Sequence, residues 1–132
     1  MPTIKATLTL TAAAGQVSTN ALTLTETDTL TIDPIPGVGV SRVALAATGG
    51  TAVELIPSTA ETKFLYVKNT ALQSDGSTPT THVVEVLIGG ASVLRVHPNE
   101  WAWVPVVASS AVTAVGSDSH LILVEYAYFT RS

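Results

Sequence analysis

The feature that most constrains the fold is a two-residue alternation of apolar and polar side chains, which recurs through the chain between turn residues. It is clearest in residues 82–105, HVVEVLIGGASVLRVHPNEWAWVP, where residues 83–88 and 93–96 both alternate. Gly89-Gly90 separates these two runs, and His97-Pro98-Asn99 reverses the chain after the second. Because successive strand side chains point to opposite faces, the stretch predicts strands joined as two consecutive β-hairpins.

The register of the first hairpin follows from its charges. A two-residue Gly-Gly loop would place Glu85 opposite Leu94 and mix charge with core. A three-residue Gly-Gly-Ala loop with a bulge instead sets Glu85 opposite Arg95, as a surface ion pair contributing at most ~1 kcal/mol. The sequence therefore predicts the longer loop, which aligns Val84, Val86 and Ile88 with Val96, Leu94 and Ser92.

The size and composition of the chain indicate a single domain with little surface charge. Its 132 residues are enough to bury a core. Charged residues make up 12% of the chain, about half the usual share of roughly 25%. Such a low charge density suggests that a partner covers much of the surface.

Several classes of function are disfavoured by composition. The net charge is -4 and the six Lys and Arg residues are scattered, so no basic patch is predicted for nucleic acid. The absence of cysteine excludes disulfides, thiolate catalysis and cysteine-based zinc sites. No apolar run approaches the ~20 residues of a membrane helix, and the first residues lack the apolar centre of a signal peptide, so neither membrane insertion nor ordinary secretion is expected.

The N-terminal third alternates leucine with threonine. Residues 4–11 read as a half-buried strand, and residues 22–25 and 30–32 repeat the pattern around Glu26-Thr27-Asp28, which we interpret as a tight turn. A strand with one apolar face must join a sheet. We therefore expect residues 1–33 to be able to form an extended arm exchanged between subunits, with Ile4, Leu8 and Leu10 on its contact side.

The remaining strands predict the fold class. Short strands are expected at residues 40–47, 51–56, 63–69, 111–115 and 121–129, with turn residues between them and no helical period. Gly49-Gly50 is expected to join the first two strands as a pair, and residues 63–69 alternate Phe64, Tyr66 and Lys68 against Leu65 and Val67. The closing run ILVEYAYF is apolar on both sides, so we expect it inside the assembly or at an interface. This pattern predicts one all-β domain, residues 1–132, folded as an antiparallel β-sandwich; a jelly roll is favoured and an immunoglobulin-like sandwich is the alternative.

No catalytic, metal-binding or cofactor-binding residues are predicted. The three histidines lack the spacing of shared metal ligands. One run of three adjacent residues contains the residue types of a hydrolase triad. A working triad needs these residues to converge from separate segments of the chain, so we interpret the run as a turn. The densest acidic group matches no calcium loop and is interpreted as a solvated turn. The residues concerned are His82, His97 and His120; Asp118-Ser119-His120; and Glu26, Asp28 and Asp33.

Trp101 and Trp103 are the most informative side chains. Their spacing of two on a strand places both indoles on one face, where aromatic rings can anchor an interface or stack on a sugar. Core packing or subunit contact, contact with a partner protein, and carbohydrate binding all remain open. Tyr126, Tyr128 and Phe129 in the closing strand are further candidates for subunit contact.

The second half of the chain resembles small virion structural proteins of tailed bacteriophages. The resemblance lies in Tyr66-Val67-Lys68-Asn69, in the Gly89-Gly90 hairpin, in Pro98-Asn99-Glu100-Trp101, and in the apolar aromatic strand of residues 124–129. These motifs are structural rather than enzymatic. The resemblance implies a β-rich decoration or cement protein of the capsid, and such proteins are commonly trimeric.

From this resemblance we expect a non-enzymatic homo-oligomer, with a trimer favoured, that is made in the host cytoplasm and binds the major capsid protein at the virion surface. A tail, neck or baseplate component is the alternative within the same class. A carbohydrate-binding sandwich is a second class and would expose Trp101 or Trp103. A sandwich enzyme of the cupin type is disfavoured because no clustered His/Glu motif occurs.

Overall fold

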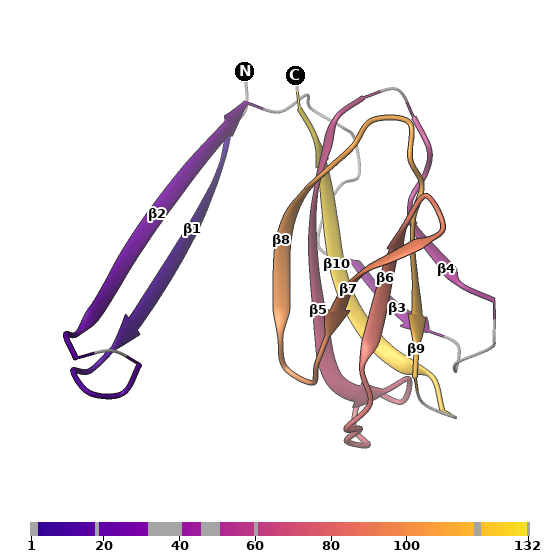
Figure 1. The fold of residues 1–132 in the computed structure, drawn as a ribbon. Helices are drawn as coiled ribbons and strands as arrows, with labels where there is room; N and C mark the ends of the chain where they lie inside the picture. The colour runs from indigo at the N-terminus through magenta and orange to yellow at the C-terminus, as the bar shows by residue number, and fades with distance from the viewer. Residues whose placement is uncertain are drawn as a thin grey trace. The chain divides into compact units, whose positions relative to one another are not determined.

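The computed structural model describes residues 3–17, 19–31, 41–45, 51–59, 61–117 and 120–131, and these are all-β, without a helix. The chain divides into two compact units, Met1–Pro34 with Ser132 and Ile35–Arg131. The strands, labelled in Figure 1, are β1 (Thr3–Ala12), β2 (Leu22–Thr31), β3 (Ser41–Leu45), β4 (Val53–Ile56), β5 (Lys63–Gln73), β6 (Val84–Ile88), β7 (Ala91–Val96), β8 (Trp101–Val106), β9 (Val112–Gly116) and β10 (Ile122–Thr130).

The second unit is an antiparallel β-sandwich, which confirms the predicted fold class. One sheet has the order β3-β10-β5-β8 and the other the order β4-β9-β6-β7 (Figure 1). The pairing is nested, because β3 pairs with β10, β4 with β9, β5 with β8 and β6 with β7. This is the strand order of a jelly roll, and it differs from that of the immunoglobulin-like alternative.

The core lies between the two sheets and draws on both. β10 is a central strand between β3 and β5, which confirms the interior position expected from its apolar composition. Alternate residues of each strand point inward, as the period of two requires. The buried cluster consists of Leu45, Leu55, Ile56, Leu65, Val67, Val84, Val86, Val96, Val106, Val112, Ala114, Ile122 and Val124.

The β6–β7 hairpin has the predicted charge pairing but not the predicted loop. Glu85 pairs with Arg95, and a guanidinium nitrogen of Arg95 lies 2.8 Å from a carboxylate oxygen of Glu85. The turn, however, has only two residues, Gly89 and Gly90, with φ of 59° and 84°, the positive values that a tight hairpin turn requires. The expected three-residue loop is wrong. Val86 pairs with Leu94 and Leu87 pairs with Ser92, so a bulge within β7 lies between Leu94 and Ser92 and absorbs the register shift.

Two further predicted connections are also wrong. His97-Pro98-Asn99 does not close a hairpin, because β7 and β8 belong to different sheets. Residues 97–100 instead form a turn, with the N–H of Glu100 donating to the carbonyl of His97 over 3.0 Å, and they carry the chain across the sandwich. β3 and β4, expected to pair with each other, likewise lie in different sheets; Gly49 and Gly50 fall outside the described residues.

Asn69 connects the two sheets from inside the sandwich. Its side chain is fully buried, and its Nδ2 donates to the carbonyls of His82 (3.0 Å) and Val96 (3.1 Å). Its Oδ1 accepts a hydrogen bond of 2.9 Å from the N–H of Ala71. A buried amide is tolerated when its hydrogen-bonding groups are satisfied. This arrangement gives a structural reason for the last residue of the Tyr66-Val67-Lys68-Asn69 motif.

The first unit is a two-stranded hairpin of β1 and β2. The turn predicted at residues 26–28 is wrong, because β2 continues through it, with Glu26 paired to Leu8 and Asp28 to Ala6. The alternation simply carries on with carboxylates in place of leucines. One hairpin face therefore holds threonine and Lys5 alone, with the hydroxyls of Thr7 and Thr27 3.1 Å apart. The opposite face holds the apolar residues and the two acids.

Candidate interaction surfaces

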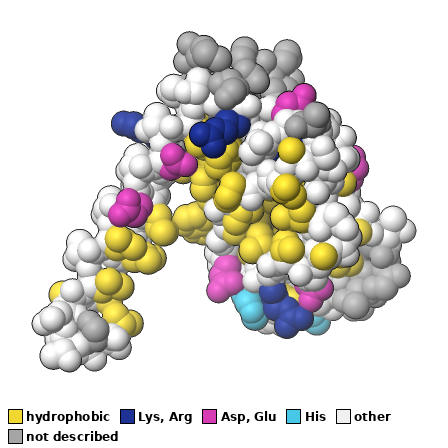
Figure 2. All heavy atoms as spheres, turned by 45° about the horizontal axis from the view of Figure 1, so that its top comes forward, with side chains coloured by type: hydrophobic (Ala, Val, Ile, Leu, Met, Phe, Trp, Pro, Cys, Tyr) yellow, Lys and Arg dark blue, Asp and Glu magenta, His cyan; other side chains and the backbone are white. Residues whose placement is uncertain are grey.

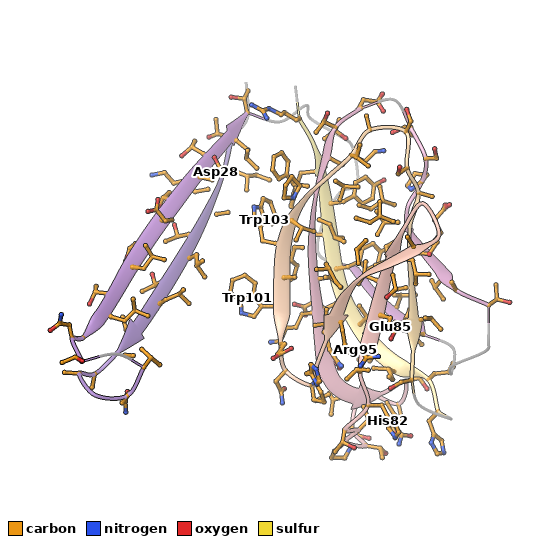
Figure 3. All side chains as sticks on the ribbon, viewed as in Figure 1. Asp28, His82, Glu85, Arg95, Trp101 and Trp103 are labelled. Atoms are coloured by element: carbon orange, nitrogen blue, oxygen red, sulfur yellow. The ribbon has the colours of Figure 1, made fainter. Side chains whose placement is uncertain are left out.

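The outer side of the β3-β10-β5-β8 sheet carries most of the aromatic side chains of the sandwich. In β8, Ala102 and Val104 pack against the core, so the alternate residues Trp101 and Trp103 point outward. Figure 3 shows both indoles on the side of β8 away from the other sheet. Antiparallel pairing sets outward residues of β5 and β10 beside them. We call this surface the aromatic face: Phe64, Tyr66, Lys68, Trp101, Trp103, Pro105, Glu125 and Phe129.

The two indoles of the aromatic face have different environments. Trp103 stacks on Phe64, with ring centroids 5.7 Å apart and planes inclined by 15°, and it also contacts Phe129 at 5.9 Å. Trp101 is 51% exposed. Trp103 therefore belongs to a packed aromatic layer, whereas Trp101 offers indole surface to a partner.

The polar residues of the aromatic face form a short network. The hydroxyl of Tyr66 donates to Oε1 of Glu125 over 3.1 Å. Burial, and next the hydrogen bond to Glu125, raise the pKa of the Tyr66 phenol above its ordinary value of 10.0. Lys68 lies in register between Trp101 of β8 and Glu125 of β10, so the face contains a cation among its aromatic rings.

The raised pKa of Tyr66 predicts a late tyrosine ionisation. Because the folded-state pKa exceeds the unfolded one, the stabilisation from this proton is complete below the unfolded pKa of about 10. It is lost as the pH rises through the folded pKa. An absorbance titration of tyrosinate should show a phase above pH 10 that is missing in Tyr66→Phe. An unchanged titration of this variant would contradict the assignment.

The structure brings only some of the predicted contact residues together. Trp101, Trp103 and Phe129 share the aromatic face, but Tyr126 and Tyr128 pack against the core on the other side of β10. The option that both indoles fill the sandwich core is wrong, because Ala102 and Val104 occupy the inward positions. Sequence reasoning did not single out Phe64 and Tyr66, although the alternation in residues 63–69 placed them on one side.

The second candidate surface is the hairpin apolar face. It consists of Ile4, Ala6, Leu8, Leu10 and Ala12 of β1 and Leu22, Leu24, Glu26, Asp28 and Leu30 of β2. Figure 2 shows hydrophobic side chains along one side of the hairpin. Four of its leucines, Leu8, Leu10, Leu22 and Leu24, are between 37% and 43% exposed. The predicted arm residues Ile4, Leu8 and Leu10 thus lie on one face, in a hairpin rather than a single strand.

An open hollow of about 530 Å³ lies along β7 and β8, the outermost strands of their sheets as far as the structure describes them. Arg95, Asn99, Glu100 and Trp101 contribute to its lining. The Glu100 carboxylate accepts a hydrogen bond of 2.9 Å from the N–H of His97, which holds the turn between the two strands. The hollow therefore combines an indole with planar polar side chains.

The structure describes only some of the acidic and histidine-containing groups that the sequence analysis considered. Glu26 and Asp28 lie within β2 rather than in a turn, and Asp33, Asp118 and Ser119 fall outside the described residues. Within the described ranges, no group of three or more His, Asp or Glu side chains is arranged to hold a metal ion. The same part of the chain contains no helix long and apolar enough to cross a membrane.

No protein-family model, no curated protein and no solved structure matches this chain. Its function is therefore inferred from its own surfaces and motifs.

Proposed function

We propose that this protein is a non-enzymatic structural protein of a tailed-bacteriophage virion, and most specifically a capsid decoration or cement protein. The observation that carries the proposal is the aromatic face. An aromatic cluster that includes the half-exposed Trp101, on the outer side of a sheet, is a typical anchor for protein contact. The resemblance of residues 66–69 and 98–101 to phage virion proteins supports the same conclusion.

In the assembly role that we propose, the protein stabilises the capsid by burying surface between subunits. Copies of the protein, with a trimer favoured, bridge neighbouring major-capsid subunits at the virion surface and resist internal pressure by adding contact area. Binding between folded subunits stabilises both partners by mass action, and symmetric copies repeat each contact around the shell. The chemistry requires neither a cofactor nor nucleic acid or a membrane.

The test is binding to capsids assembled from the major capsid protein of the same phage. We expect the purified protein to sediment with these capsids and to appear by electron microscopy at many symmetric sites. Trp101→Ala should weaken binding on the order of tenfold to a thousandfold, in the range of an interface hot spot. Val93→Ala, which alters an exposed apolar residue of the other sheet, should bind normally.

Two results would contradict the decoration role. Failure of the wild-type protein to bind capsids would remove it altogether. A few copies located at one vertex or on the tail would instead support the rival tail, neck or baseplate component.

A carbohydrate-binding module is the second candidate, because Trp101 is exposed and lines the hollow with Arg95, Asn99 and Glu100. Sugars are recognised by an aromatic platform together with planar polar side chains that form hydrogen bonds. This candidate predicts a shift in tryptophan fluorescence when bacterial surface polysaccharides are added, and the loss of that shift in Trp101→Ala. An unchanged spectrum over a panel of such glycans would exclude it.

A further inference from the structure

The outer edge of β8 is less protected against strand pairing than the other outer strands of the sandwich. As far as the structure describes the two sheets, β3 and β8 are outermost in one, and β4 and β7 in the other. Proteins commonly protect such edges with charged residues, bulges or short strands. β3 contains Arg42, β4 has four residues with Glu54 and a register shift, and β7 contains Arg95 and a bulge. β8 has no charged residue and pairs with β5 in an unbroken register.

The backbone of β8 directs two hydrogen-bond donors toward this edge. Residues of an antiparallel strand direct their N–H and C=O groups alternately to one neighbour and to the other. The carbonyl of Glu100 accepts a hydrogen bond of 3.0 Å from the N–H of Asn69, so Glu100 and the alternate residues after it face β5. Trp101, Trp103 and Pro105 therefore face the outer edge, where a proline removes no hydrogen bond of the sheet. The N–H groups of the two tryptophans lie about 6.8 Å apart, the repeat of a second strand.

The hollow beside this edge can accept side chains of an added strand. It has a volume of about 530 Å³ and lies along β7 and β8, with an apolar lining from Leu94, Val96 and Ala102. A strand paired with β8 would direct alternate side chains toward the hollow and the others toward the exposed indole of Trp101. Strand addition at a sheet edge gains affinity from main-chain hydrogen bonds and specificity from such pockets.

The β8 strand of a second copy is a poor occupant of the edge. In an antiparallel pairing centred on Trp103, Trp101 of each copy would lie opposite Pro105 of the other. Because proline has no N–H, one carbonyl of each copy would remain without a donor. A strand that has no proline at this position can form the complete set of hydrogen bonds.

We propose that the capsid partner contributes an extended segment that pairs with the outer edge of β8. The segment accepts hydrogen bonds from the N–H groups of Trp101 and Trp103 and places alternate apolar side chains in the hollow beside Leu94. This inference rests on the proposed function, which assigns the contact at Trp101 to the capsid, and it specifies the secondary structure of the partner at that contact.

Two variants at the first residue of β8 separate the backbone from the indole. Trp101→Ala and Trp101→Pro both remove the indole, but only proline also removes the N–H at the edge. Proline is tolerated at the first residue of a strand, so the two variants should have the same midpoint in urea denaturation followed by Trp103 fluorescence. We expect Trp101→Pro to bind capsids roughly fivefold more weakly than Trp101→Ala, because one interstrand hydrogen bond is lost.

Amide hydrogen exchange of the wild-type protein, free and bound to capsids, gives an independent measurement. The N–H groups of Trp101 and Trp103 should exchange at least about tenfold more slowly in the bound state, because they gain acceptors. The N–H groups of Ala102 and Val104 face β5 in both states. Their exchange is therefore the internal control and should change much less.

The inference requires both results. Equal capsid binding by the two variants, or unchanged exchange at Trp101 and Trp103 in bound wild type, would overturn it and leave the proposed function intact. If Trp101→Pro does not fold, the exchange pattern alone decides. A free wild-type oligomer in which these two amides are already protected would place a second copy on the edge and overturn the capsid partner as the source of the strand. Absence of capsid binding by the wild type would contradict the proposed function and this inference together.

Discussion

Replacing Asn69 with leucine is expected to lower the free energy of unfolding of the sandwich by about 2–4 kcal/mol. The two side chains are similar in size, so the loss comes from polar groups and not from a cavity. Leucine would leave the carbonyls of His82 and Val96 and the N–H of Ala71 without their present partner. Each buried group left unsatisfied costs about 1–3 kcal/mol. A large effect is expected because these groups connect the two sheets.

Urea denaturation followed by tryptophan fluorescence measures this effect in the sandwich, because both tryptophans of the chain lie in β8. Thr70→Val is the comparison variant. It removes one side-chain hydrogen bond, from the Thr70 hydroxyl to the carbonyl of Leu123 (2.6 Å), and should cost about 1 kcal/mol. If Asn69→Leu is as stable as Thr70→Val, the amide does not have the connecting role described here.

The second large effect is expected at Trp103. Trp103→Ala should destabilise the sandwich by about 2–3 kcal/mol, because it removes the ring contacts with Phe64 and Phe129 and part of the apolar surface that they bury. Trp101→Ala should change stability by no more than about 0.5 kcal/mol, as expected of an exposed side chain. The same urea experiment compares the two variants, since each retains one tryptophan as the reporter.

This contrast separates folding from binding on one surface. A loss of capsid binding in Trp101→Ala, without a loss of stability, would mark that indole as a contact residue. A loss of capsid binding in Trp103→Ala would not distinguish a contact residue from a structural residue, because this substitution also changes the packing of the aromatic layer. Equal stability losses in the two variants would contradict the different environments assigned to the indoles.

Much of the aromatic face was predictable from local alternation. The spacing of Trp101 and Trp103 placed them on one face, and the pattern in residues 63–69 separated Phe64, Tyr66 and Lys68 from Leu65 and Val67. The side of each strand that meets the core was not predictable. It depends on the partner strand and on the position of the second sheet, which lie far away in the sequence. Alternation alone separates Tyr126 and Tyr128 from Phe129, but only the tertiary structure shows that the two tyrosines lie against the core and Phe129 with the indoles.

The sequence by itself determined the all-β class, the approximate positions of most strands, the interior position of β10 and the Glu85–Arg95 pair. These features follow from side-chain periodicity and from charges a few residues apart, which act locally. Only the tertiary structure decided the nested pairing of β3 to β10, the continuity of β2 and the crossing of residues 97–100 between sheets. Turn residues can begin a hairpin or a crossover equally well, and the choice depends on which distant strands bury the most apolar surface together.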